Sequence, residues 1–99
     1  MLCRLQTERG EVLEQVVDRS GHIAASAPAL ADEGSPCWRF IDPYGNTVFN
    51  RLQMEAFLVE LDLIIRQATP ERVPILEKVR ALALRCRDDV HLYLQFEGD

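Results

Sequence analysis

The sequence contains no apolar run that approaches the length of a membrane-spanning helix, so no membrane insertion is predicted. Its first residues, MLCRLQTERGE, include neither an apolar segment nor a small-residue cleavage site, which argues against a secretory signal. Cysteine is scarce and odd in number: Cys3, Cys37 and Cys86 include no pair with CxxC spacing. We therefore expect reduced thiols in a cytoplasmic protein rather than a disulfide framework.

Residues that carry chemistry are also few. The only histidines are His22 and His91, and no local spacing of Cys, His, Asp or Glu predicts a metal site, so no metal and no cofactor are expected. The GxSxG, P-loop, GxGxxG and HExxH patterns are absent. Cys37 and His22 are conceivable as a nucleophile and its base, but nothing in the sequence fixes their geometry. We expect a protein without catalytic activity and predict no catalytic residue.

Basic residues are outnumbered, with 11 Lys and Arg against 16 Asp and Glu, which gives a net charge of −5. This balance disfavours non-specific binding to nucleic acid or to anionic membranes and favours a basic protein partner. The basic residues near the C-terminal end of the second predicted helix do not form one patch. Lys78 and Arg85 lie on one flank of its apolar stripe, and Arg80 and Arg87 lie on the other. We predict a solvated helix face there and no nucleic-acid site.

The 99 residues, 47% hydrophobic and 27% charged, have the balance of a single globular domain spanning 1–99. The predicted strands are Leu2–Thr7, Val12–Asp18, Cys37–Ile41, Thr47–Phe49 and Val90–Phe96, and the predicted helices are 51–68 and Val73–Arg87. Residues 12–18 also fit a short helix, although we prefer a hairpin with Gly10 at positive φ in its turn. The order ββ, loop, ββ, α, α, β indicates an α+β fold. Its antiparallel sheet of about five strands would carry two helices packed on one face.

Residues 19–36 read RSGHIAASAPALADEGSP and show no periodicity, so a flexible loop is predicted there. Ser26 and Pro28 would permit one short helical turn around Ala29–Ala31. In the last strand, Val90, Leu92, Leu94 and Phe96 are expected to face the core, and His91, Tyr93 and Gln95 the other side. We expect Trp38 and Phe40 to join the core.

The segment FIDPYGNTVFN, residues 40–50, raises the question of a ligand site. Asp42 suits the first position of a type I turn, where its carboxylate accepts a backbone N–H, and Pro43 presets φ at the next position. Gly45 suits a left-handed position that closes the turn. A hairpin turn therefore explains the residue choice without a ligand. Asn50 and Gln53 then have the spacing of a capping box at the start of helix 51–68.

The continuous segment CWRFIDPYGNTVFNRLQ, Cys37 to Gln53, resembles a segment of small uncharacterised bacterial proteins, including products of mobile integron gene cassettes. The resemblance covers the middle of the chain. It implies a bacterial, mobile-element context and a cytoplasmic protein. It carries no catalytic assignment and transfers no functional residue.

Helix 51–68 has two apolar stripes rather than one. The wider stripe consists of Met54, Phe57, Leu58, Leu61, Ile64, Ile65 and Ala68 and should meet the sheet. The narrower stripe, on the opposite side, consists of Leu52, Ala56, Val59 and Leu63. It requires a cover, either within the chain if the helix is central or from a second copy of the protein in a two-fold homodimer.

Two functions of different classes follow from these features. The first is a non-enzymatic protein-association module, a homodimer through helix 51–68 that neutralises or regulates a basic partner. The alternative is a small-molecule-binding protein with a pocket between loop 19–36 and the sheet. The predicted pocket residues are Trp38, Tyr44, Tyr93 and His91.

Overall fold

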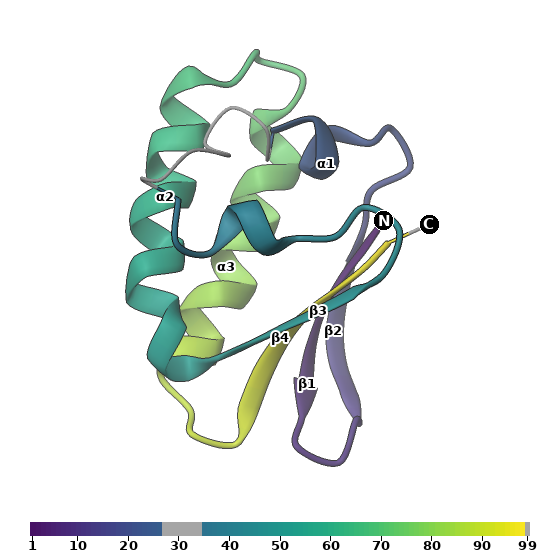
Figure 1. Ribbon diagram of the computed structural model, residues 1–99, viewed down its shortest axis with the longest axis vertical. Coiled ribbons are helices and arrows are strands. Elements are labelled where there is room, and N and C mark those ends of the chain that lie inside the picture. Colours follow the sequence, from purple (N-terminus) through teal and green to yellow (C-terminus); the bar gives the residue numbers. More distant parts are fainter. Residues whose placement is uncertain (27–34, 99) are drawn as a thin grey trace.

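The computed structural model describes residues 1–26 and 35–98. They form an α+β fold in which two long helices, α2 and α3, cover one face of a four-stranded antiparallel sheet (Figure 1). The sheet order is β2-β1-β4-β3. In chain order the elements are β1 (Leu2–Thr7), β2 (Val12–Val17), α1 (His22–Ser26), the 3-10 turn η2 (Trp38–Phe40), β3 (Asn46–Asn50), the 3-10 turn η3 (Arg51–Gln53), α2 (Met54–Gln67), α3 (Val73–Arg87) and β4 (Leu92–Glu97).

The sheet contains four strands rather than the predicted five, because residues 37–41 are not a strand. They form η2, whose Trp38 is fully buried while Phe40 is 58% exposed. The prediction that both aromatics join the core is therefore wrong for Phe40, which instead lies under the Arg39 guanidinium at 4.7 Å. Trp38 stacks on Phe57 of α2, with ring centroids 5.1 Å apart. A short apolar segment that reads as a strand thus forms a turn that inserts one ring into the core.

The β1–β2 hairpin is confirmed, and the alternative of a helix at residues 12–18 is wrong. Gly10 has φ 84° in its turn, as expected. The prediction of loop 19–36 is only partly right, since α1 lies within it. The buried Asp18 carboxylate accepts hydrogen bonds from the backbone N–H groups of His22 (3.1 Å) and Ile23 (2.7 Å) and so fixes the start of that helix. The turn predicted at 29–31 lies outside the described residues.

Strand β4 begins at Leu92 rather than at Val90. Asp89 forms a turn there, because its carboxylate accepts the His91 N–H (2.9 Å) and its carbonyl accepts the Leu92 N–H (3.2 Å). Val90 is consequently 57% exposed instead of buried. From Leu92 onward the predicted alternation is confirmed. The side chains buried on the helix-covered face of the sheet are Cys3, Leu5, Val16, Phe49, Leu92, Leu94 and Phe96.

Both helices present the predicted apolar faces to this core. The buried side chains of α2 include Met54, Phe57, Leu58, Leu61 and Ile64, and those of α3 are Leu76, Val79, Leu82, Ala83 and Cys86. The predicted capping box is also present. The Asn50 side chain accepts from the N–H groups of Leu52 (3.0 Å) and Gln53 (3.3 Å), and the Gln53 side chain accepts from the Asn50 N–H (2.9 Å). The first turn, η3, has 3-10 geometry, which is common at helix starts.

Candidate functional site

Three sides of α2 are occupied within the chain. Its wide apolar stripe faces the core, and its Asp62 carboxylate pairs with Arg80 of α3 across 2.9 Å. On the opposite flank, Glu60 contacts the segment that leads into η2. Only the side that carries the narrow stripe is left without a packing element among the described residues, and in Figure 1 this helix runs along the margin of the molecule.

On the flank of α2 opposite Asp62, the side chain of Glu60 holds the start of η2 against the helix. Its side chain is 3% exposed, and its carboxylate accepts hydrogen bonds from the backbone N–H groups of Cys37 (3.1 Å) and Trp38 (3.3 Å) and from the Ser35 hydroxyl. The carboxylate therefore caps η2 from a distance of 22 or more residues along the chain. The sequence pattern places Glu60 among the polar residues that separate the two stripes. No local spacing signals that its partners are the backbone groups of a remote turn.

The narrow stripe is exposed along its whole length. Leu52 is 74% exposed, Val59 63% and Leu63 39%, and Ala56 is exposed as well. Because α3 covers the Asp62 flank and η2 covers the Glu60 flank, neither element shields these side chains. The C-terminal half of the stripe borders an open hollow of about 220 Å³, lined by Val59, Asp62, Leu63 and Arg66. An apolar row beside a hollow is typical of a surface that contacts another molecule.

The turn at residues 42–45 is explained by its internal contacts. The Asp42 carboxylate accepts the Tyr44 N–H (2.8 Å), as predicted, and the Gly45 N–H reaches the Asp42 carbonyl (3.4 Å). Gly45 does not have positive φ, so that part of the prediction is wrong. A Cβ there would lie 2.7 Å from an Asp42 carboxylate oxygen, a contact that the rotatable Asp42 side chain can relieve by moving. The turn joins η2 to β3 and closes no hairpin, since β3 pairs only with β4.

A second close contact fixes this turn against the end of β4. The Gly98 N–H donates to the Gly45 carbonyl (2.7 Å), and a Cβ on Gly98 would lie 2.5 Å from the carbonyl carbon and oxygen of Pro43. Backbone therefore meets backbone directly, which only glycine permits. The carboxylate and backbone groups of this segment are used for structure, and Tyr44 alone projects from it, 84% exposed.

The four residues predicted to line a ligand pocket are not brought together. Trp38 is buried on the helix-covered side of the sheet, with its ring 6.0 Å from that of Phe96, whereas Tyr93 points from β4 to the opposite face. Tyr44 lies on its exposed turn. His91 is exposed near Glu8, with 3.8 Å between the ring nitrogen and the carboxylate. Trp38 and Tyr93 cannot line one pocket, because the sheet separates them.

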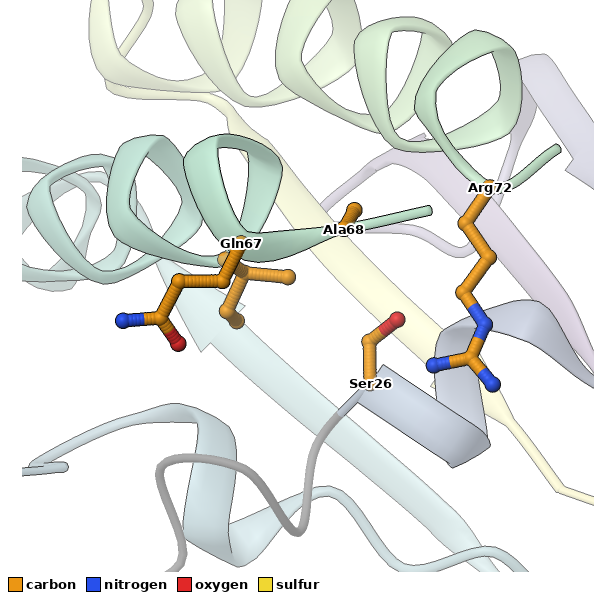
Figure 2. Close-up of a pocket in the computed structure, with 5 residues that line it drawn as sticks. Ser26, Gln67, Ala68 and Arg72 are labelled. Carbon is orange, nitrogen blue, oxygen red and sulfur yellow. The ribbon is translucent and has the colours of Figure 1, made fainter. Parts of the chain in front are cut away.

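A small cavity lies where α1 meets the end of α2 and the start of α3. Figure 2 shows Ser26 and Arg72 facing the C-terminal end of α2 across it. Its volume is about 40 Å³ and its lining residues are Ser26, Ile64, Gln67, Ala68 and Arg72. The Ser26 hydroxyl donates to the His22 carbonyl (2.7 Å), so it is already used within α1. The cavity has room for one or two waters rather than for a metabolite.

No nucleophile is activated in the described structure. Burial, together with the Glu60 carboxylate, raises the pKa of the Cys37 thiol to about 11, so this thiol is protonated at neutral pH. Burial raises the pKa of Cys86 to about 11 as well, and Cys3 is fully buried with its pKa raised. Residues 1–26 and 35–98 hold no cluster of three or more His, Cys, Asp or Glu side chains that could bind a metal ion.

No protein-family model, curated protein or solved structure matches the chain. The resemblance of residues 37–53 to integron cassette products therefore stays a prediction. Within the described residues, no helix combines the length and the apolar character that crossing a bilayer would demand. Function has to be inferred from the surface itself, and its most distinctive feature is the exposed stripe on α2.

Proposed function

We propose that this protein is a non-enzymatic association module that forms a homodimer through the outer side of α2. The observation that supports the proposal is the exposed row of Leu52, Ala56, Val59 and Leu63 on a helix whose other sides are all packed. A helix with its back to water needs only one apolar stripe, and a second one costs solubility unless it is covered.

The energy available from this surface indicates a dimer of moderate strength. Full burial of a large aliphatic side chain contributes about 1.5–3 kcal/mol, so the exposed parts of Leu52, Val59 and Leu63 on two copies sum to about 8 kcal/mol. Part of this gain is offset by the loss of translational and rotational freedom. We therefore expect a dissociation constant between about 1 μM and 1 mM.

The test is the solution mass of the protein, measured by light scattering over a concentration series from roughly 1 μM to 1 mM, which brackets that range. We expect the wild type to approach the dimer mass and the variants Leu63→Asp and Val59→Asp to remain folded monomers. Ala81→Asp is the matched control, because Ala81 is an exposed alanine within α3 and does not belong to the stripe. A monomeric wild type at the highest concentration would refute the proposal.

The two stripe variants guard against a misleading result from misfolding. Val59 is more exposed than Leu63, 63% against 39%, so an aspartate at position 59 is the less disruptive change to the fold. If both variants keep the circular dichroism of the wild type and both stay dimeric, the interface lies elsewhere and the proposal fails.

We further propose that the dimer acts on a basic protein partner. The support is the net charge of −5, which attracts cationic surfaces over a Debye length of about 10 Å at 0.1 M salt. Association with such a partner should weaken steeply as salt is raised. Binding that is insensitive to salt would argue against this partner class.

A further inference from the structure

We propose that the two α2 helices of the dimer pair antiparallel, with Val59 of one copy against Leu63 of the other and Glu55 beside the partner's Arg66. This inference rests on the proposed homodimer and specifies its geometry. It is drawn from the charges that flank the stripe and from the position of the hollow.

One edge of the stripe carries charges of opposite sign at its two ends. Glu55 and Arg66 are both exposed and lie 11 residues apart, which is three helical turns, so they share one line along α2. Among residues 1–26 and 35–98, neither side chain forms a hydrogen bond or a close ion pair, although Asp88 and, to a smaller extent, the Glu55 carboxylate raise the pKa of Arg87 on α3. Asp62, between them on the same flank, is already paired with Arg80. The edge therefore carries an exposed acid at one end and an exposed base at the other.

This pattern distinguishes the two possible helix directions. In an antiparallel pair related by a two-fold axis, the acidic end of each helix meets the basic end of the other, which creates two Glu–Arg contacts. In a parallel pair, this edge of one helix would instead lie beside the opposite edge of the other, which carries Gln53, Glu60 and Gln67, so no Glu55–Arg66 contact would form. Charges at the rim of an interface favour one register over another more than they add affinity.

The surface of α2 is hollowed close to the point where the two-fold axis of this antiparallel pair would pass. The midpoint between Glu55 and Arg66 falls between residues 60 and 61, so Val59 and Leu63 lie on either side of the two-fold axis. The hollow lined by Val59, Asp62, Leu63 and Arg66 lies at this point. Each hollow can receive an aliphatic side chain of the other copy. The small side chain of Ala56, about one helical turn before Val59, permits the two helices to approach closely. Each copy then contributes the same surface patch, as a two-fold contact requires.

Disulfide cross-linking through one added surface cysteine tests the antiparallel arrangement. In the antiparallel register Val59 lies close to its own counterpart, whereas two Leu52 positions are separated by roughly 26 Å along the axis, at 1.5 Å rise per residue. Under mild oxidation we expect Val59→Cys to give a disulfide-linked dimer and Leu52→Cys to give little, a difference of at least tenfold in yield. The wild type is the control, because its three native cysteines are buried.

Charge reversal gives a second readout. Glu55→Arg and Arg66→Glu should each weaken dimerisation several-fold at low salt, and the double variant should return to within about twofold of the wild type, since it restores opposite charges. In a parallel pair the Glu55/Arg66 edges of the two copies would not meet, so neither the single variants nor the double variant would show this pattern of loss and recovery.

The possible failures are distinguishable. Efficient cross-linking of Leu52→Cys in a dimeric protein would overturn the antiparallel arrangement while leaving the dimer intact. A dimeric protein in which neither cysteine cross-links would overturn the use of α2. A wild type that is monomeric by light scattering would overturn the proposed function itself.

Discussion

Replacing Glu60 should destabilise the fold far more than replacing an exposed carboxylate. The Glu60→Ala variant would leave the buried N–H groups of Cys37 and Trp38 and the Ser35 hydroxyl without their acceptor. A buried donor that loses its partner costs about 1–3 kcal/mol, and water entering the space left by the side chain recovers part of this cost. We expect a total loss of about 3–5 kcal/mol in the free energy of unfolding.

The Glu60→Gln variant separates charge from shape. Its amide keeps one acceptor oxygen, but it turns an NH₂ group toward backbone donors, so we expect a loss of about 2 kcal/mol. For a domain whose total stability is about 5–15 kcal/mol, both effects are large. At roughly 4–8 °C per kcal/mol, the alanine variant should melt about 12–40 °C lower than the wild type.

Urea unfolding followed by tryptophan fluorescence is the appropriate assay. Trp38 is the only tryptophan of the chain, and it lies in the turn that Glu60 caps, so it reports on the affected segment. Glu77→Gln is the matched control, because Glu77 is an exposed carboxylate on α3. If Glu60→Ala loses less than about 1 kcal/mol, or if Glu60→Gln behaves like Glu77→Gln, the carboxylate does not hold η2 as argued.

Two further outcomes are expected. Gly98→Ala should lower the free energy of unfolding by about 1–3 kcal/mol, because the new methyl group overpacks against the Pro43 backbone. Gly45→Ala should lose less, because its methyl group meets only the rotatable Asp42 side chain. Equal losses for the two variants in urea unfolding would contradict the backbone contact. Because the folded pKa of Cys37 and of Cys86 is about 11 and lies above the unfolded value, the stability that these protonated thiols contribute is complete below about pH 8.5 and is lost as the pH rises through 11. Alkaline unfolding should therefore be less steep in Cys37→Ala, and an unchanged pH profile would contradict this assignment.

The elements set by local pattern could be predicted from the sequence. The capping box at Asn50 and Gln53, the start of α3 at Val73 and the inward face of β4 all follow from spacings of a few residues. The second apolar stripe of α2 could be predicted in the same way, but whether the chain itself covers it could not, because that depends on how the other elements pack.

The elements set by distant contacts could not be predicted. Residues 37–41 are apolar and aromatic like a strand, yet the Glu60 carboxylate accepts hydrogen bonds from the N–H groups of Cys37 and Trp38, and the segment forms a 3-10 turn. From the sequence alone, a glutamate at position 60 is predicted to be exposed to solvent, because nothing near it in the chain indicates its partners at residues 35–38. The requirement for glycine at position 98 is equally invisible, since it arises from the backbone of Pro43, 55 residues earlier.

The sheet order has a consequence for how the chain acquires its structure. β1 and β4 form the central pair, and among the described residues β3 pairs with β4 alone. During synthesis the β1–β2 hairpin emerges early, and an isolated hairpin is at best marginally stable in water. β3 is made before β4, the strand that joins it to this hairpin. We therefore expect a nascent chain that stops before Leu92 to remain unfolded and prone to non-native contacts, and folding to be completed late, in a single step, when β4 inserts.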